Sequence, residues 1–415
     1  MGEIPHTFVS QTTQQIHTGD TNFVDVPGVS IASSKFVAGR KYLIFVSSIM
    51  GGDSVSQVFA SQMLHGSTIF TESVQAFEQS NETTLPTGHS YQWFTVWTAI
   101  AGEEIKLQFQ TKNSGQTVRA DNTVMMVMEL SEKLIENVDW FFNFNNTGRL
   151  LTGSLASRPE QAQVTFTPAS NAKYLVIGYA RVDVVLFTNR VRARLNHDSG
   201  ATFFPATFRE GEDSLETPIH FLVRPFDLLS QSNKFEIETS VFPGTGESLL
   251  ENAIFILNMN KFQDAAFEYK DFGLNLTTTP VSQATVTLTP SVTGDFFALA
   301  FFLNNPDIVS PAATAMVSLN IDGSVNPVGT VVAGMGTYDS TDLPWNSIFT
   351  ISNETNVSHT WDCMGRDNGD SRPDAQRVSI AVFSMQVDET PAIEVLNSQK
   401  ILSTRSKHGV ISKGD

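Results

Sequence analysis

Fully apolar runs recur at three places along the chain, at Tyr42–Val46, Tyr174–Ile177 and Phe296–Ala300. A strand that is apolar on both sides is predicted to be buried on both faces. Other segments alternate strictly, as in Ile105–Gln110, which is typical of a strand with one face in water. Glycine- and asparagine-rich turns separate these segments, and we find no convincing helical period. The pattern therefore predicts short β-strands throughout.

The surroundings of these runs repeat as well. Val164-Thr165-Phe166-Thr167-Pro168 is followed six residues later by Tyr174, and Val286-Thr287-Leu288-Thr289-Pro290 is followed at the same spacing by Phe296. An aromatic strand comes next in each copy, around Trp93, His220–Phe226 and Trp345–Ile351. A repeat of more than 100 residues is a whole domain and not a solenoid unit.

These signals predict an all-β chain of three tandem antiparallel β-sandwich or jelly-roll-like modules with extended N- and C-terminal arms. The expected boundaries are an N-terminal arm at 1–20, module 1 at 21–133, module 2 at 134–262, module 3 at 263–390 and a basic tail at 391–415. The segments between modules, roughly 131–163 and 260–283, contain aromatic residues. We expect either modules docked on one another or connecting segments that add strands to the next sheet.

Composition narrows the class of protein. The 415 residues carry a formal charge of −17, which argues against binding to a nucleic-acid backbone. Cys363 is the single cysteine, so a disulfide framework is excluded. The first 20 residues have no basic and apolar signal-peptide pattern, and no apolar run is long enough for a transmembrane helix. We expect no membrane association and synthesis in a host cytoplasm.

The C-terminal tail differs in charge from the rest of the chain. Residues 391–415 contain two acidic residues and four basic ones, which are Lys400, Arg405, Lys407 and Lys413. A basic arm on an acidic body can lie across a neighbouring protein, and short apolar pieces such as Ile401-Leu402 can add to a sheet edge. The tail is therefore a candidate partner-binding segment. The alternative is a frayed terminus with no partner.

Two tryptophans form a second candidate partner-binding site. Trp93 and Trp97 share one face of the most aromatic strand. Flat indole rings can stack on sugars, but they also serve in cores and in subunit contacts. We favour packing, because both faces of this strand are apolar.

Candidate catalytic and metal-binding residues are sparse. His359 and Cys363 are predicted on one side of a strand with Trp361 between them, which favours a core cysteine over a base–thiol pair. The segment Asp367-Asn368-Gly369-Asp370 has neither the spacing nor the closing glutamate of a calcium loop, and a tight turn explains it better. We expect no enzyme activity, no cofactor and no metal site.

With its tandem modules and the repeated Val-Thr-Leu-Thr-Pro followed by Phe296-Phe297-Ala298-Leu299-Ala300, the chain resembles the multi-domain β-sandwich proteins of tailed bacteriophage particles. The resemblance implies a structural virion protein that contacts other virion proteins, forms a homo-oligomer and is located in the virion. The first hypothesis is a capsid-associated decoration or head-fibre subunit held by its terminal arms. The alternative is a tail-fibre or receptor-binding adhesin that recognises a host glycan or surface protein.

Overall fold

A computed structural model describes residues 2–19, 21–53, 57–78, 89–112, 114–151, 161–183, 190–198, 202–210, 219–242, 248–271, 279–305, 314–334, 345–367 and 374–387. Nearly all of these residues lie in antiparallel β-sheets, as the sequence predicted. Three single-turn 3-10 helices, η1 (Ser33–Lys35), η2 (Thr71–Ser73) and η3 (Met259–Lys261), are the helices of the described residues. None of them has the length or the apolar composition that crossing a membrane requires.

Module 1 is a sandwich of two five-stranded sheets. Its strands are β2 (His6–Gln11), β3 (Gln15–Thr18), β4 (Val24–Ile31), β5 (Lys41–Gly52), β6 (Val58–His65), β7 (Thr68–Ile69), β8 (Gln75–Glu78), β9 (His89–Thr98), β10 (Ile105–Thr111) and β11 (Thr117–Glu129). The first sheet has the order β2-β11-β5-β9, with β3 beside β11, and the second has the order β4-β10-β6-β7, with β8 beside β6.

Module 2 repeats this plan. Its strands are β12 (Trp140–Asn145), β13 (Arg149–Leu150), β14 (Gln163–Phe166), β15 (Ala172–Asp183), β16 (Arg190–His197), β17 (Thr202–Glu210), β18 (Ile219–Leu228), β19 (Asn233–Phe242) and β20 (Ser248–Asn258). One sheet has the order β12-β20-β15-β18, with β13 beside β20, and the other has the order β14-β19-β16-β17.

Module 3 follows the same plan with four strands in each sheet. Its strands are β21 (Ala265–Lys270), β22 (Val281–Leu288), β23 (Gly294–Asn305), β24 (Thr314–Ile321), β25 (Ser324–Gly334), β26 (Trp345–Glu354), β27 (His359–Asp367) and β28 (Asp374–Ser384). The sheet orders are β21-β28-β23-β26 and β22-β27-β24-β25. In module 3 this is the 1-8-3-6 and 2-7-4-5 order of an eight-stranded jelly roll, and the sheets of modules 1 and 2 have corresponding orders.

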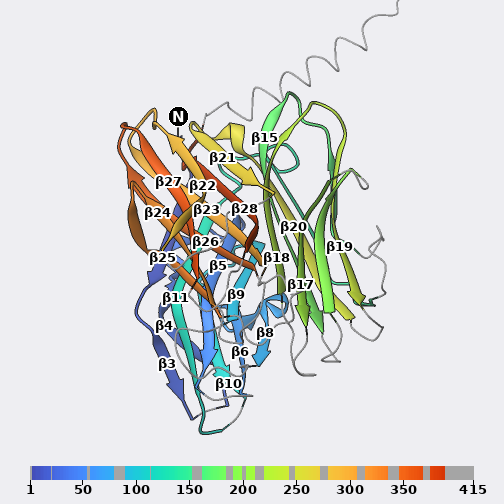
Figure 1. Cartoon of the computed structure of the whole chain (residues 1–415), viewed down its shortest axis with the longest axis vertical. Helices are drawn as coiled ribbons and strands as arrows, with labels where there is room; N and C mark the ends of the chain where they lie inside the picture. Colours follow the sequence, from blue (N-terminus) through green and yellow to red (C-terminus); the bar gives the residue numbers. More distant parts are fainter. Residues whose placement is uncertain are drawn as a thin grey trace, which may run out of the picture.

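The three modules pack side by side, with module 2 in green and yellow-green and module 3 in orange in Figure 1. The repeated apolar runs lie in β5, β15 and β23, which are the third strands of their jelly rolls. Each of these runs is buried on both faces, as predicted. In β23, Phe296, Ala298, Ala300 and Phe302 fill the interior of module 3. The alternate residues Phe297, Leu299, Phe301 and Leu303 belong to a cluster that also contains the module 1 core.

Module 2 shows the same division of its central strand. Tyr174, Val176 and Ala180 pack inside the module, whereas Leu175, Ile177 and Tyr179 join the shared cluster. The outer faces of one sheet from each module thus meet in a common apolar interior, which we call the central core. Because burying apolar side chains is the main favourable term in folding, the central core joins the modules into one body.

The connecting segments supply strands to the following module. β12 lies in the segment between modules 1 and 2, and β21 lies in the segment between modules 2 and 3. Both pair with the last strand of their own sandwich, as β12 does with β20 and β21 with β28. Docked modules and strand-adding connections, which the sequence analysis offered as alternatives, occur together.

The N-terminal segment corrects one expectation. Of the arm expected at residues 1–20, the structure describes 2–19, and these residues do not form an arm outside the first module. β2 and β3 pair antiparallel with β11 and so belong to the sheet of module 1. A short strand before them, β1 (Gly2–Glu3), pairs with β29 (Gln386–Val387), close to the end of the described chain. Backbone hydrogen bonds stabilise an edge strand even when its side chains are polar. The hydrophobic pattern of the sequence therefore did not predict these strands.

Candidate functional site

A groove opens along one side of module 2, between the edge strands β12 and β14. Its volume is about 1010 Å³, and residues of η3 and of the turn before β15 close one end. β12 and β14 each end a sheet, so the groove runs where the two sheets of the sandwich separate. This position gives it both a floor of core side chains and walls of strand backbone.

Aromatic side chains form the floor of the groove. Phe141 and Phe166 stack with ring centroids 4.3 Å apart, and Phe166 lies 5.0 Å from the ring of Tyr174. Burial raises the pKa of Tyr174 to about 12, so its phenol remains a neutral hydrogen-bond donor. The floor therefore suits an apolar occupant that also offers hydrogen-bond acceptors.

Strand backbone forms the walls. In an antiparallel pair, successive residues direct their N–H and C=O groups alternately toward and away from the partner strand. The Gln163 N–H points away from β19, because it donates to Asn143 Oδ1 across the groove at 3.3 Å. The backbone of Thr165, two residues further along the same strand, has the same outward direction. An edge of this kind can accept another extended segment.

Charged side chains lie at the η3 end of the groove. Lys261 Nζ is 3.2 Å from Asp139 Oδ1, and the Asp139 side chain is 2% exposed while that of Lys261 is 30% exposed. Asn260 accepts a hydrogen bond from the Lys173 backbone N–H at 2.9 Å. The buried Asp139 carboxylate and the partly exposed Lys261 ammonium group therefore make this end of the groove polar.

The corresponding side of module 3 is bridged differently. The Glu268 carboxylate on β21 accepts a hydrogen bond from the backbone N–H of Thr285 on β22. These two strands occupy the positions that β12 and β14 occupy in module 2. Sequence reasoning did not find the groove, because its width depends on how far the two edge strands diverge.

The first and last described segments of the chain meet near the η3 end of the groove. Val387 forms an antiparallel bridge with Phe262, and Gln263 N donates to Gln386 O at 2.9 Å. On the opposite side of β29 lies β1. One short strip of backbone therefore connects the first described residues, the last ones and the junction of modules 2 and 3.

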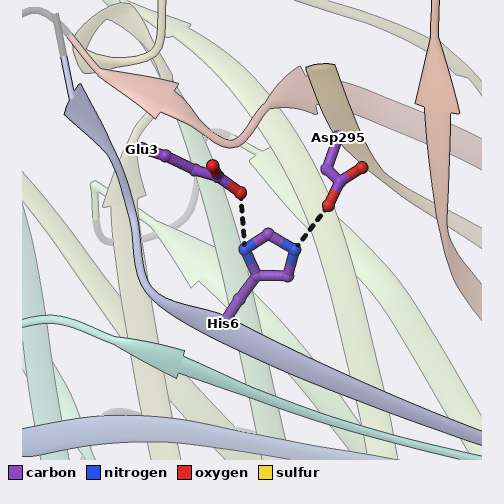
Figure 2. A group of neighbouring side chains, drawn as sticks. All are labelled: Glu3, His6 and Asp295. Atoms are coloured by element: carbon purple, nitrogen blue, oxygen red, sulfur yellow. Dashed lines mark hydrogen bonds and ion pairs between the residues drawn. The ribbon is translucent and has the colours of Figure 1, made fainter.

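His6 links the N-terminal strand to module 3 beside this strip. Its Nε2 lies 3.1 Å from Asp295 Oδ2, while its Nδ1 lies 2.9 Å from Ile4 O and 3.7 Å from Glu3 Oε1. Figure 2 shows the two carboxylates at opposite nitrogens of the ring. One metal ion cannot use both nitrogens of one imidazole, and the two carboxylates do not converge on a single ring nitrogen of His6.

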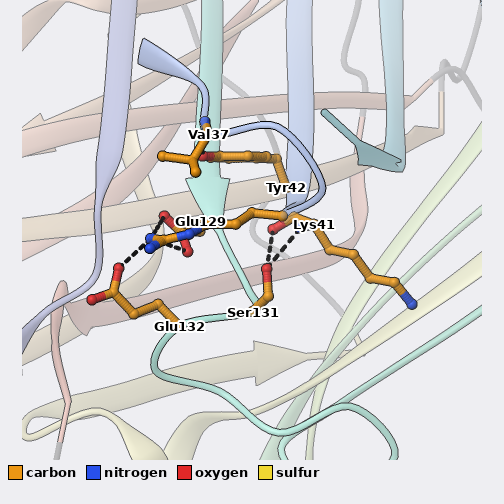
Figure 3. Close-up of polar contacts among 7 residues, drawn as sticks. Val37, Lys41, Tyr42, Glu129, Ser131 and Glu132 are labelled. Carbon is orange, nitrogen blue, oxygen red and sulfur yellow. Dashed lines mark hydrogen bonds and ion pairs between the residues drawn. The ribbon is translucent and has the colours of Figure 1, made fainter. Parts of the chain in front are cut away.

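A second polar cluster anchors the start of the connection to module 2 (Figure 3). Arg40 Nη1 lies 2.9 Å from Glu129 Oε1 and 2.5 Å from Glu132 Oε2. The Ser131 hydroxyl accepts from the Lys41 backbone N–H at 2.7 Å. The Glu129 side chain is 2% exposed, so the arginine compensates a buried charge. The cluster has a structural role at the end of β11.

The two tryptophans proposed as a partner-binding site lie in the interior. Trp93 is 0% exposed and 5.1 Å from the Phe70 ring, and Trp97 is 7% exposed and 5.2 Å from the Phe36 ring. Stacking on a sugar requires an open ring face. The placement agrees with the packing interpretation of both residues.

The His359–Cys363 pair is not a base and a nucleophile. Burial raises the pKa of the Cys363 thiol to about 12, which keeps it protonated and inert. His359 instead contacts Asp322 Oδ2 through Nδ1 at 2.7 Å, and its Nε2 lies 3.1 Å from the Thr355 carbonyl oxygen. The core interpretation of Cys363 accounts for its surroundings.

Thr355, His359 and Asp322 have the composition of a catalytic triad, but their geometry does not suit catalysis. The Thr355 hydroxyl is 3.5 Å from His359 Nε2, while the carbonyl oxygen of the same residue is closer. Burial lowers the pKa of His359, but the hydrogen bond to Asp322 and the charges of Glu354 and Asp322 raise it more, so the net shift is upward. Because the Thr355 carbonyl oxygen lies closer to His359 Nε2 than the hydroxyl does, this nitrogen is not positioned as a base for the hydroxyl.

The other predicted site residues lie outside the described part of the chain. These are the tail residues Lys400, Arg405, Lys407 and Lys413 and most of the segment Asp367–Asp370, of which the described β27 includes only Asp367. Their roles stay predictions.

No protein-family model matches the chain, and no curated protein matches it. Several solved structures are similar to it at low identity. A peptide-N4-(N-acetyl-β-D-glucosaminyl)asparagine amidase is similar over 59% of this chain and 97% of that protein, with 10% identity and a TM-score of 0.30.

Two virus proteins are similar over a larger part of the chain. A protein described for the triple jelly roll fold and turret assembly of an archaeal virus covers 91% of each chain, with 10% identity and a TM-score of 0.21. A chain of the lipid-containing bacteriophage PM2 covers 92% of this chain and 99% of its own, with 8% identity and a TM-score of 0.19. The neighbours thus include virus proteins and an enzyme, and similarities this distant assign no role to this chain.

Proposed function

We propose that the chain is a non-enzymatic structural protein of a virus particle, and that it serves as a capsid-associated decoration or head-fibre subunit. The observation that supports this most is the central core, in which three jelly rolls bury one sheet face each against the other modules. Such a body is rigid, because its modules cannot rotate without exposing apolar side chains. A rigid, acidic, multi-module body suits a structural component.

The contacts with other virion proteins would then come from parts that the central core leaves free. These are the outer sheets, the edge strands and the tail with its four basic residues. The described histidine and cysteine sites support the non-enzymatic part of the proposal, because Cys363 is buried and the ring nitrogens of His359 lie against Asp322 and the Thr355 carbonyl oxygen. Assembly as a homo-oligomer is part of the same proposal and is measured by light scattering on the purified protein.

Deletion of residues 391–415 tests the anchoring role of the tail. We expect the deletion variant to be absent from purified particles while it still accumulates as folded protein in infected cells. A matched variant with Lys400, Arg405, Lys407 and Lys413 all replaced by glutamine separates charge from length. Particles that retain the deletion variant at full occupancy would contradict tail anchoring.

A glycan array with the wild-type protein addresses the adhesin alternative. Specific glycan binding would favour a tail-fibre or receptor-binding role over a decoration role. Trp93→Ala is unsuitable as the diagnostic variant, because removing a fully buried indole costs stability whatever the function. Exposed loop residues are the better targets if binding is found.

A further inference from the structure

The last described residues run toward the groove of module 2. Val387 faces Phe262 and Gln386 faces Gln263 in an antiparallel register. Continued by one residue, this register brings Asp388 opposite Lys261, which lines the groove at its η3 end. Lys261 is 30% exposed on its side chain and carries the opposite charge to Asp388.

The groove continues in the direction that the chain would take. β14 ends at the same end of the groove, because Tyr174, six residues after Pro168, pairs with Asn258, just before η3. A segment that enters beside Lys261 would therefore run antiparallel to β14. Antiparallel addition is the geometry that the outward backbone groups of Thr165 accept.

The sequence after Val387 fits such a strand. Asp388-Glu389-Thr390 is polar, Pro391 is tolerated because the added strand would be an edge strand, and Ile393-Glu394-Val395 alternates between apolar and charged positions. At this period Ile393 and Val395 share one face, so both can lie on the aromatic floor while Glu394 faces water. Six residues of strand span about 20 Å, which allows Ile393 to pass the η3 end.

We propose that residues 388–396 of this chain occupy its own groove as a strand added to β14. The added strand covers the Phe141–Phe166–Tyr174 floor and completes the open edge of module 2. It also fixes where the basic residues from Lys400 to Lys413 leave the body. The groove is then a latch for the tail and not a binding site for a small molecule.

Cysteine cross-linking in the full-length protein tests this proposal. Cys363 is 0% exposed and gives a silent background for thiol reagents. The test variant combines Thr165→Cys with Glu394→Cys, because Thr165 is exposed on β14 and Glu394 is on the same, water-facing side of the added strand, and it is treated with a short bis-maleimide. The control combines Thr287→Cys with Glu394→Cys, because Thr287 is the exposed counterpart of Thr165 in module 3.

We expect an intramolecular cross-link in the Thr165 pair at a rate at least about tenfold above the control, because docking raises the effective concentration of the tail thiol. Peptide mass spectrometry of the monomer band identifies the linkage. Equal rates in the two pairs would overturn the proposal. A product found only between two chains would also overturn it, since a second copy would then fill the groove.

Hydrogen exchange gives a readout that needs no substitution. Deletion of residues 388–415 should speed exchange at the Thr165 amide and leave the Thr287 amide unchanged. Unchanged exchange at Thr165 would contradict the latch, and it would leave the groove to another occupant.

Discussion

The ring of Phe45 meets the ring of Phe349 edge to face, with centroids 4.6 Å apart and planes at 90°. Phe45 belongs to module 1 and Phe349 to module 3. The same Phe45 ring lies 5.5 Å from Phe221 of module 2, again at nearly a right angle. One side chain thus contacts all three jelly rolls through the favoured geometry of aromatic pairs.

Replacing this ring should weaken the whole body and not one module. For Phe45→Ala we expect a loss of ~3–5 kcal/mol in the free energy of unfolding, because a fully buried ring leaves a cavity. Urea denaturation followed by tryptophan fluorescence measures it. Val37→Ala serves as the control, since Val37 is 49% exposed and should change stability by less than ~0.5 kcal/mol. An unchanged midpoint for Phe45→Ala would show that the modules hold together without the central core.

Gln92 and Ser347 connect modules 1 and 3 through a reciprocal pair of hydrogen bonds. The Ser347 hydroxyl donates to Gln92 Oε1 at 2.6 Å, and Gln92 Nε2 donates to the Ser347 carbonyl at 2.9 Å. Both residues are 0% exposed, and the Ser347 carbonyl also accepts from the Ser47 hydroxyl at 3.2 Å. Gln92→Ala should therefore cost ~1–3 kcal/mol, mainly because the Ser347 hydroxyl loses its acceptor. A double-mutant cycle with Ser347→Ala isolates the hydroxyl contribution. A coupling energy near zero would contradict this assignment.

The Cys363 thiol should report on the unfolding of module 3. With burial raising its pKa to about 12, we expect no reaction with a thiol reagent in the native protein at neutral pH. Reaction should begin only in the urea range that unfolds the sandwich. Rapid labelling without denaturant would mean that the interior of module 3 opens readily.

His359 and Asp322 should make stability depend on pH. The folded pKa of His359 is raised, so its contribution is complete below ~6.5 and is lost as the pH rises through the folded value. The hydrogen bond from His359 holds the pKa of Asp322 below its ordinary value, so that contribution is lost at acidic pH. His359→Gln should remove the decline of stability on the alkaline side. Thermal unfolding between pH 5 and 8 measures the effect, and a parallel decline in the variant would assign it to other groups.

The three-module architecture could be predicted from the sequence because strands that are buried on both faces are apolar at every position. Runs such as Tyr174–Ile177 are apolar at every position since one face fills the module and the other fills the central core. The sequence did not predict β2, because this strand is partly exposed and is stabilised by backbone hydrogen bonds to β11. The sequence did not predict the groove either, since Val164–Pro168 beside the groove and Val286–Pro290 in module 3 have nearly the same sequence pattern. The distance between two edge strands depends on tertiary packing, so it cannot be predicted from the local sequence pattern.

The pairing of β1 with β29 has a consequence for biosynthesis. Gly2 is synthesised long before its partner Val387, because the two lie 385 positions apart in the sequence. Contacts this distant in sequence close late, because the loop between them must first be ordered. The amino-terminal strand pair therefore waits until translation has reached the third jelly roll. A fragment that stops short of residue 387 would leave β1 without this partner and His6 with less support beside Asp295.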